Sequence, residues 1–438
     1  MTRRHFPFFF VLLMLLAACS DDETFSSSPS DRLSFSTDTV RLDTMFSGTP
    51  SPTYTFWVHN TTSKGLRMSN VRLERGNQSG FRVNVDGTFL DPIATGLEIR
   101  HGDSLRVFVE ATTLLQNSAT PQLVEDNLIF ALESGIEQKV NLRTYSWDAE
   151  KIGTLRISRD TTIQSAIPLV VFDSIIVEQG ATLTISDTQL FFHDKAGIRV
   201  SGTITAQRCL FRGDRLDHMF DYLPYDRISG QWGGIVISSP PGNINSFTDC
   251  DIRNATDAVV CDSAAVAFTR CTIHNSRGYG VKAANATMSF YNCIMSNSMN
   301  DCLAIDGGTI LIDHCTLAQF YPFKADRGVA LRFTNGCADM LLKCVNTLVT
   351  GYADDVIMGD AADTARVFDY YLADCILRTI PVEDTLRCER VVWETAQDSV
   401  QATKHFKTID ETNFIYDFTI DSISPAIKAD AGARLEKQ

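Results

Sequence analysis

The sequence predicts an all-β protein in which a right-handed parallel β-helix follows an antiparallel β-sandwich. Four cysteines, at positions 250, 271, 293 and 315, recur every 21 or 22 residues in one frame. Each has an apolar residue three positions before it, another two after it, and Asn or Gln four after it. A fixed period of this size, in short β-type runs without helical periodicity, is typical of stacked coils. The region before the repeat alternates apolar and polar residues, which is typical of antiparallel strands with one buried face.

Composition and charge narrow the class of partner. The chain has 438 residues, 44% of them hydrophobic and 21% charged, as in ordinary globular proteins. Its formal net charge is −14, and phosphate backbones are bound by basic surfaces. We therefore expect no nucleic-acid partner.

Residues 1–19 have the organisation of an export signal. Arg3 and Arg4 precede an apolar run, residues 6–16, which is too short to span a bilayer as a stable helix. The run ends in Leu-Ala-Ala-Cys, which resembles a bacterial lipobox. The resemblance implies cleavage before Cys19, lipidation of that residue and attachment to a membrane through the lipid.

Residues 20–30 are rich in Ser and Asp and are predicted to form a flexible tether. The acidic residues at 21–23 resemble the surface-export signal of some Gram-negative lipoproteins. That resemblance implies an outer-membrane, lipid-anchored protein at the cell surface. A simple solvated tether explains the same three residues, and both interpretations stay open.

Residues 31–147 are predicted to form the β-sandwich. About eight short alternating runs occur there, including 54–58, 81–85, 104–109 and 127–132, with turn residues between them. Their order resembles Ig-like modules of the abnormal-spindle type. The resemblance implies an Ig-like β-sandwich that acts as a spacer, and this region contains no catalytic constellation.

Residues 148–438 are predicted to form the parallel β-helix. Cys209 extends the column of cysteines backwards, and Cys344 and Cys375 are expected to continue it, which makes seven in one stack. Buried cysteine behaves as a small apolar residue, so we expect reduced, inward-facing thiols. The sequence has no C-x-x-C motif and no paired His spacing, which makes a zinc site improbable.

Three segments of this region resemble right-handed parallel β-helix repeat lipoproteins of Gram-negative bacterial surfaces. They are VEQGATLTI (177–185), RGDRLDHMFDYLPYDRISGQWGGI (212–235) and SPAI (424–427). The resemblance covers most of residues 151–438 and implies the fold and the location. It implies little about activity, because a fold does not determine a function.

Uneven intervals between successive cysteines of the column indicate where a ligand site would lie. The intervals after Cys209, Cys315 and Cys344 are 41, 29 and 31 residues, longer than one coil. The excess predicts loops at 213–230, 319–328 and 351–366 on one face, and such insertions often form the binding face. We expect one groove there, and the candidate ligand-binding residues are Asp217, Asp221, Tyr225, Asp226, Arg227, Asp326, Arg327, Asp354 and Asp355.

Carboxylates beside aromatic rings suit a carbohydrate, and paired carboxyl groups can act as acid and base. The sequence therefore predicts a surface protein that binds polysaccharide or another polar ligand on the looped face. One alternative is a polysaccharide lyase or glycoside hydrolase on that face; another is a structural or adhesive protein, with the same residues bracing the loops. The polygalacturonase signatures Asn-Thr-Asp, Gly-His-Gly and Arg-Ile-Lys are absent.

No cofactor is expected, although clustered carboxylates would suit Ca²⁺ in a lyase. Trp232 would either pack under the first loop or present a platform to a sugar.

Overall fold

The computed structural model describes residues 24–435. Contacts divide the chain into two units, which meet in the sequence between Trp147 and Asp148. Cys19 and the predicted export signal lie outside the described residues. No helix within residues 24–435 is both long and apolar enough to cross a membrane.

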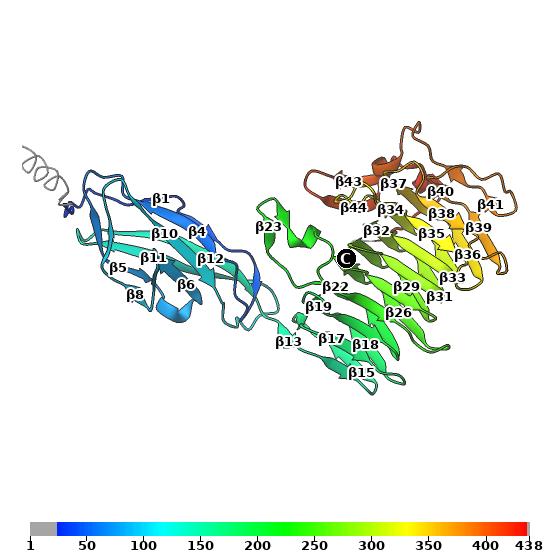
Figure 1. Ribbon diagram of the computed structural model, residues 1–438, viewed down its shortest axis with the longest axis horizontal. Coiled ribbons are helices and arrows are strands. Elements are labelled where there is room, and N and C mark those ends of the chain that lie inside the picture. The colour runs from blue at the N-terminus through cyan, green and yellow to red at the C-terminus, as the bar shows by residue number, and fades with distance from the viewer. Residues whose placement is uncertain (1–23, 436–438) are drawn as a thin grey trace, which may run out of the picture. The chain divides into compact units, whose positions relative to one another are not determined.

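The first unit consists of two sheets that enclose a common core (Figure 1). The first sheet runs β1 (Ser34–Phe35), β4 (Tyr54–His59), β10 (Ser104–Ala111), β6 (Phe81–Val85) and β7 (Thr88–Phe89). The second runs β2 (Thr39–Arg41), β12 (Glu137–Trp147), β11 (Gln122–Leu132), β5 (Leu66–Leu73) and β8 (Ile93–Ala94), with β3 (Met45–Phe46) on β12 and β9 (Leu97–Ile99) on β5.

Alternation explains this unit, because every second residue of strands such as β6 and β10 is buried. Most strand pairs are antiparallel, as predicted, although β2 and β3 pair with β12 in parallel. The Ig-like topology stays a prediction. The described end of the expected tether is ordered against this unit: Phe25 forms a bridge with Gly65 and lies under the guanidinium of Arg67.

The second unit is a stack of parallel coils. One sheet, here called sheet A, consists of β13 (Glu150–Ile152), β16 (Leu169–Val171), β19 (Gln189–Phe192), β22 (Leu210–Gly213), β27 (Asp251–Arg253), β30 (Thr272–Ser276), β32 (Ile294–Ser298), β34 (Thr316–Gln319), β37 (Leu348–Gly351), β40 (Ile376–Leu377) and β42 (Val392–Trp393). All of its neighbouring strands pair in parallel, so each coil adds one rung.

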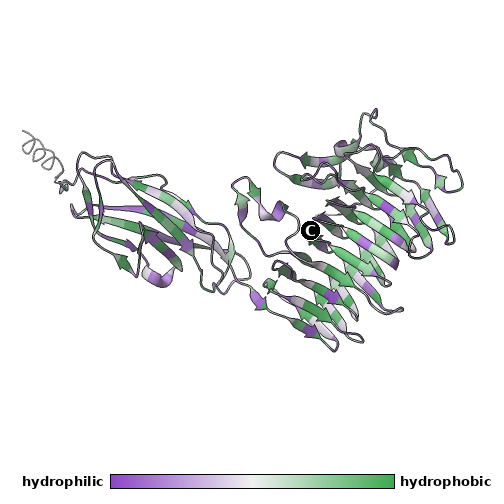
Figure 2. Cartoon of the chain, in the orientation of Figure 1, coloured by the Kyte–Doolittle hydropathy of each residue, from purple (hydrophilic) through white to green (hydrophobic). Residues whose placement is uncertain are grey.

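The other strands of the coils form sheet B, which bends around the remaining sides. It consists of β14 (Leu155–Ile157), β15 (Thr161–Gln164), β17 (Ser174–Val177), β18 (Thr182–Ser186), β20 (Gly197–Val200), β21 (Thr203–Gln207), β25 (Gly234–Ile237), β26 (Ile244–Thr248), β28 (Val259–Asp262), β29 (Ala265–Thr269), β31 (Val281–Tyr291), β33 (Leu303–Asp313), β35 (Leu331–Thr334), β36 (Met340–Val345), β38 (Ile357–Asp360), β39 (Phe368–Ala373) and β41 (Cys388–Glu389). Figure 2 shows apolar residues recurring along the stacked strands, and inward-facing side chains of both sheets form one continuous core.

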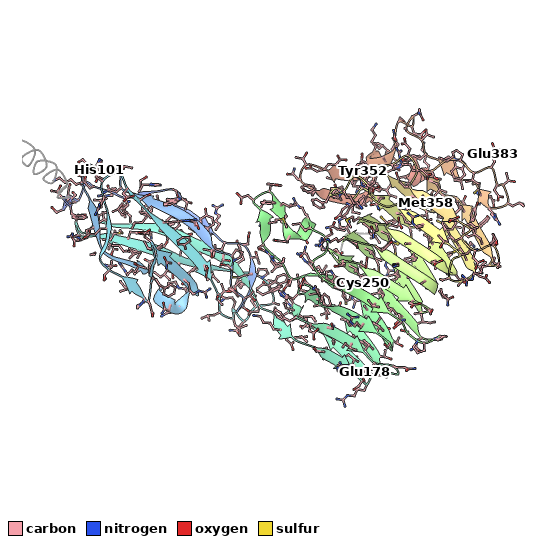
Figure 3. All side chains as sticks on the ribbon, in the orientation of Figure 1. His101, Glu178, Cys250, Tyr352, Met358 and Glu383 are labelled. Carbon is pink, nitrogen blue, oxygen red and sulfur yellow. The ribbon has the colours of Figure 1, made fainter. Side chains whose placement is uncertain are left out.

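The cysteine column is real but differs from the prediction at one position. Register places Cys209, Cys250, Cys271, Cys293 and Cys315 at the same corner of successive coils, just before sheet A. Figure 3 labels Cys250 within this stack. All eleven cysteines in the described part of the chain are free thiols, and those of the column are buried.

The expectation that Cys344 continues the column is wrong. Asp313 pairs with Val345 and Thr316 with Leu348, so Thr347 follows Cys315 in the column, and Cys375 follows Thr347. Cys344 instead pairs with Ile312 and Leu372, three positions earlier in the coil. It therefore extends the inward stack of Phe247, Phe268 and Phe290, whose rings lie 5.0 and 5.3 Å apart.

This shift changes the third predicted loop. Between β37 and β38 only a short turn, residues 352–356, leaves the coil, and the other extra residues, 361–367, lie at a different corner before β39. The predicted insertion 351–366 is therefore not one loop, and it contains β38. The first two insertions do share a corner, because they follow β22 and β34 of sheet A.

The coils end at β42, earlier than residue 438. The chain then forms η3 (Ala402–His405), an antiparallel hairpin of β43 (Phe406–Asp410) and β44 (Ile415–Ile420), and α2 (Pro425–Lys428). This hairpin covers the later rungs of sheet A from outside (Figure 1), where Phe406 and Phe418 pack with Phe320.

Candidate functional site

A groove of about 1280 Å³ lies between the uncovered rungs of sheet A and the β43–β44 hairpin. A smaller hollow of about 280 Å³ adjoins it beside the first loop, and Arg253, His274 and Tyr416 line both. We refer to the two together as the sheet A groove.

The repeat places polar side chains on the floor of the groove. The first and third residues after each column cysteine point outward from sheet A, because the second points into the core. In β27 these residues are Asp251 and Arg253, and in β30 they are Thr272 and His274. Ile252 and Ile273, between them, are fully buried.

Two arginines and two aspartates form an ion cluster at this floor. Arg212 Nη1 lies 2.6 Å from Asp226 Oδ1, and Arg253 Nη1 lies 3.4 Å from the same oxygen. Arg253 Nη2 is 3.0 Å from Asp251 Oδ2. The Asp226 side chain, 43% exposed, therefore lies over two guanidinium groups.

Two polar atoms of the groove, Asp251 Oδ1 and Arg253 Nε, are buried and make no hydrogen bond within the described residues. Buried polar atoms in folded proteins are nearly always paired. Because both line one groove, they indicate a place where an external polar molecule completes the hydrogen bonding.

The pKa shifts follow from this environment. Burial raises the pKa of Asp251, against the opposing effect of Arg253. Burial, helped by Arg253, lowers the pKa of His274 to about 4, so this imidazole is neutral at neutral pH. Burial also lowers the pKa of Arg212, and the neighbouring positive charge of Arg253 acts in the same direction.

Neighbouring residues hold the cluster in place. Trp232 is buried, stacks on Phe192 at 4.5 Å and donates from Nε1 to the carbonyl of Arg253 at 2.8 Å. It therefore packs beneath the loop and presents no platform. Asn254 donates to the carbonyl of Asp226 at 3.0 Å and accepts from Asn275 at 2.9 Å. The stacked asparagines of neighbouring coils thus position the loop that carries Asp226.

The first loop carries five of the predicted site residues, and they have different environments. Asp226 and Arg227 line the hollow. Asp217 is buried and paired with Arg215, whose guanidinium lies 3.7 Å from the Tyr225 ring centre. These contacts brace the loop. Asp221 is exposed near the tip, beside the β23–β24 hairpin (His218–Phe220 and Leu223–Pro224).

The other predicted residues are dispersed. Asp326 is exposed, and Arg327 lies over the ring of Tyr352 at 4.7 Å. Asp354 pairs with the buried Arg378 at 2.6 Å, and Asp355 accepts a hydrogen bond from Thr379 at 2.7 Å. These two aspartates support the turn after β37 and are absent from the groove lining.

The loops nevertheless meet through the C-terminal hairpin. Ser229 of the first loop bonds to Tyr321 of the second at 2.8 Å, and Arg227 donates to the carbonyl of Asn413 at 2.6 Å. Tyr352, labelled in Figure 3, donates to Glu411 at 2.6 Å. The predicted common face thus exists for the first two loops, with the hairpin as an unexpected third component.

Sequence reasoning missed Arg212, Asp251, Arg253, His274 and Tyr416. The first four could have been found by writing out the repeat in columns, because the outward positions after Cys209, Cys250 and Cys271 carry ionisable groups on three successive rungs. Tyr416 could not, because nothing in its local pattern distinguishes a returning hairpin from another coil.

Another constellation resembles a catalytic triad in its chemistry but is buried. His405 lies 2.7 Å from Ser424 Oγ and 2.5 Å from Glu394 Oε2, and Glu394 also pairs with Arg378. All three triad-like residues are at most 4% exposed, so no substrate reaches them. The network fastens the C-terminal segment to the last coils.

A separate hollow of about 620 Å³ lies on the outer surface of sheet B, lined mainly by apolar and small residues such as Ala265, Ala267 and Leu311. It contains no clustered ionisable groups comparable with the sheet A groove. No group of three or more metal-binding side chains occurs in the described part of the chain.

Comparison with known proteins supports the architecture. Residues 159–317 match the family model described as a right handed beta helix region. Together with the parallel register of sheets A and B, this match makes the second unit a right-handed parallel β-helix repeat. No curated protein matches the chain.

Two solved structures overlap weakly with the chain. One is a family 123 glycoside hydrolase from Clostridium perfringens (9% identity, 27% of this chain and 26% of that chain, TM-score 0.18). The other is the catalytic unit of a thermostable GH87 α-1,3-glucanase from Streptomyces thermodiastaticus (9% identity, 78% and 89%, TM-score 0.19). The chain spans about a quarter of the first of these proteins. Neither overlap is close enough to carry an argument about activity.

Proposed function

We propose that this protein binds a polysaccharide in the sheet A groove while a lipid on Cys19 holds it at an outer-membrane surface. The observation that carries the binding proposal is the pair of buried, unpaired polar atoms, Asp251 Oδ1 and Arg253 Nε, in one open groove. Sugar hydroxyls both donate and accept, so they can satisfy a carboxyl oxygen and a guanidinium nitrogen together.

The walls of the groove support the same ligand class. Phe414, Ile415 and Tyr416 of the hairpin face the hollow opposite the ion cluster. Ligand sites commonly combine apolar and aromatic walls with a few fixed polar groups. The groove also crosses several rungs, which suits an extended chain better than a compact small molecule.

A glycan array followed by calorimetry tests this proposal. Thr272→Trp places a large ring on the floor of the groove and is expected to abolish binding of the array hits. Thr287→Trp is the matched control, because Thr287 lies outward on sheet B in the other hollow. Equal loss in both variants, or no loss in Thr272→Trp, would exclude the groove as the site.

Glycoside hydrolysis is a second candidate, favoured by one observation. Asp251 has a raised pKa and an unpaired Oδ1 close to a second carboxylate, Asp226. A protonated Asp251 would donate to the glycosidic oxygen while water adds to the anomeric carbon and loses its proton to a carboxylate. Release of reducing ends from a bound glycan, lost in Asp251→Asn with binding retained, would establish it. Binding without turnover would leave a binding protein.

A further inference from the structure

A column of basic side chains runs along sheet A, and two of its members, Arg253 and His274, line the groove. Arg212, Arg253 and His274 occupy the third position of β22, β27 and β30, and register places them on adjacent rungs. Neighbouring strands are about 4.8 Å apart, so these groups are close enough to repel when charged. The lowered pKa of Arg212 and of His274, each partly caused by Arg253, reflects this crowding.

The acidic partners of the column are limited. Asp226 is shared between Arg212 and Arg253 and is itself 43% exposed on a loop. Asp251 pairs with Arg253, but burial raises its pKa and so makes it easier to neutralise. Asp249 also lines the groove and is already paired with Arg270, and Asp417 lies on the hairpin side.

Arginines on other coils of the β-helix make a two-point contact with a carboxylate that Arg253 lacks. Arg208, Arg270 and Arg390 each use Nε and Nη2 together to hold both oxygens of one aspartate. Such two-point pairs are the strongest and most directional contacts of arginine with a carboxylate. In Arg253, Nε has no partner, although it is buried.

We infer that the ligand of the groove is an anionic glycan, whose carboxylate or sulfate is bound by Nε of Arg253 above the column of Arg212 and His274. This inference rests on the proposed function and narrows it. An anion there completes the hydrogen bonding of Arg253 and relieves the repulsion along the column. A neutral sugar can complete the hydrogen bonding of Arg253 but leaves the repulsion along the column unchanged.

Calorimetry with three hexasaccharides tests the inference: xylohexaose is neutral, hexagalacturonate carries carboxylates, and a carrageenan hexasaccharide carries sulfates. Both anionic chains are expected to bind at least about ten-fold more tightly than xylohexaose, since a hydrogen bond between two charged groups is stronger than one between a guanidinium and a neutral hydroxyl. Preference for one of them identifies whether carboxylate or sulfate is the natural group.

Variants of Arg253 separate charge from geometry. Arg253→Gln should remove the preference for anionic chains, and Arg253→Lys, which keeps the charge without Nε, should retain only part of it. Arg390→Gln is the control, because its ion pair with Asp374 lies on the last coils, away from the groove. Unchanged thermal midpoints confirm that the variants fold.

A second readout concerns His274. Binding of hexagalacturonate should raise the imidazole pKa of His274 in an NMR titration, because an added negative charge favours the protonated ring. If xylohexaose binds as tightly as the anionic chains and Thr272→Trp blocks all three, the groove binds glycans but the anionic preference is wrong. If the anionic chains bind and Thr272→Trp does not affect them, or if none of the three binds, both proposals fail.

Discussion

The column residues solve a hydrogen-bonding problem at one corner of each coil. The residue before each column position, for example Asp249, Arg270 or Asn292, has a positive φ of 49–55°. This turn leaves the carbonyl two positions before the cysteine facing inward, and the thiol donates to it, as in Cys293 to Tyr291 O at 3.3 Å. The backbone N–H of Cys293 donates to the sulfur of Cys315 in the next coil at 3.4 Å.

Threonine does the same at two positions of the column. Thr347 donates to the carbonyl of Val345 at 2.7 Å and accepts from the backbone of Cys315 at 3.3 Å. Thr188, which register places in the column one coil before Cys209, donates to the carbonyl of Ser186 in the same way. The position therefore requires a short side chain that both donates and accepts, and burial, which raises the pKa of the Cys293 thiol well above its ordinary range, keeps the donor protonated.

We predict that Cys293→Ala lowers the free energy of unfolding by about 1–3 kcal/mol, because two buried backbone groups lose their partners. Cys293→Thr should cost clearly less, since threonine supplies both functions. Urea unfolding followed by circular dichroism measures the difference. Cys302→Ala serves as a control, because Cys302 is buried outside the column. Equal costs for Ala and Thr at position 293 would mean that the thiol only fills space.

His274 should make stability depend on pH. Its folded pKa, about 4, lies below the ordinary value of 6.5, so the unfolded chain takes up a proton first as the pH falls. Stability should therefore decrease between about pH 6.5 and pH 4, by at most about 3 kcal/mol from this group, and change no further below that window.

The charges of Arg253 and Asp226 act on this imidazole in opposite directions. Its Nδ1 lies within hydrogen-bond distance of Ser296, and the rings of Tyr416 and Phe418 pack beside it. His274→Gln should flatten the decrease in that pH range, as measured by urea unfolding at a series of pH values. An unchanged slope in this variant would assign the acid sensitivity to other groups.

At the scale of elements, the β43–β44 hairpin is an attached wall of the groove. Its inner rings pack on sheet A, and the buried network of Glu394, His405 and Ser424 fastens the segments before and after it. Burial alone would raise the pKa of Glu394, but His405 and Arg378 hold it below the ordinary value. Glu394 is therefore ionised at neutral pH, and both of its carboxylate oxygens are paired.

We predict that His405→Ala destabilises the C-terminal segment by about 3–5 kcal/mol, because Glu394 and Arg378 are left as an incompletely paired buried charge. Hydrogen exchange should accelerate in residues 406–420 but not in β27 and β30, and glycan affinity should fall. Glu411→Gln, at the exposed partner of Tyr352, should change exchange little. Equal acceleration throughout the coils would show that the hairpin and the β-helix unfold as one unit.

Sequence alone could predict the register of the coils from Cys250 to Cys315, because nearly equal spacing admits one alignment. It failed at Cys344, because cysteine suits both the column and the apolar stack, and only the pairing of Asp313 with Val345 distinguishes them. Asp226 and Arg227 were predicted in the groove lining because they lie on a true insertion. Asp354 and Asp355 were placed by the mistaken register, and they support a turn instead.

At the scale of the whole molecule, anchoring by Cys19 stays a prediction. Cys19→Ser should leave an uncleaved precursor or a released protein, because a lipobox without its cysteine cannot be lipidated. Fractionation of cells followed by immunoblotting measures the membrane-bound share. A variant with deleted residues 21–23 tests surface export separately. Unaltered membrane partitioning of Cys19→Ser would refute the lipid anchor.

The groove is complete only after the β43–β44 hairpin has packed onto sheet A. The floor belongs to strands between Leu210 and Ser276, whereas the opposite wall is contributed by Phe414, Ile415 and Tyr416. A chain that emerges from its N-terminus can stack its early coils first, since each coil needs only its neighbours. The groove then remains half-built until the β43–β44 hairpin arrives and docks. Molecules truncated before this hairpin would therefore carry a well-formed β-helix and an open sheet A surface, so that binding reports on the docking of the hairpin.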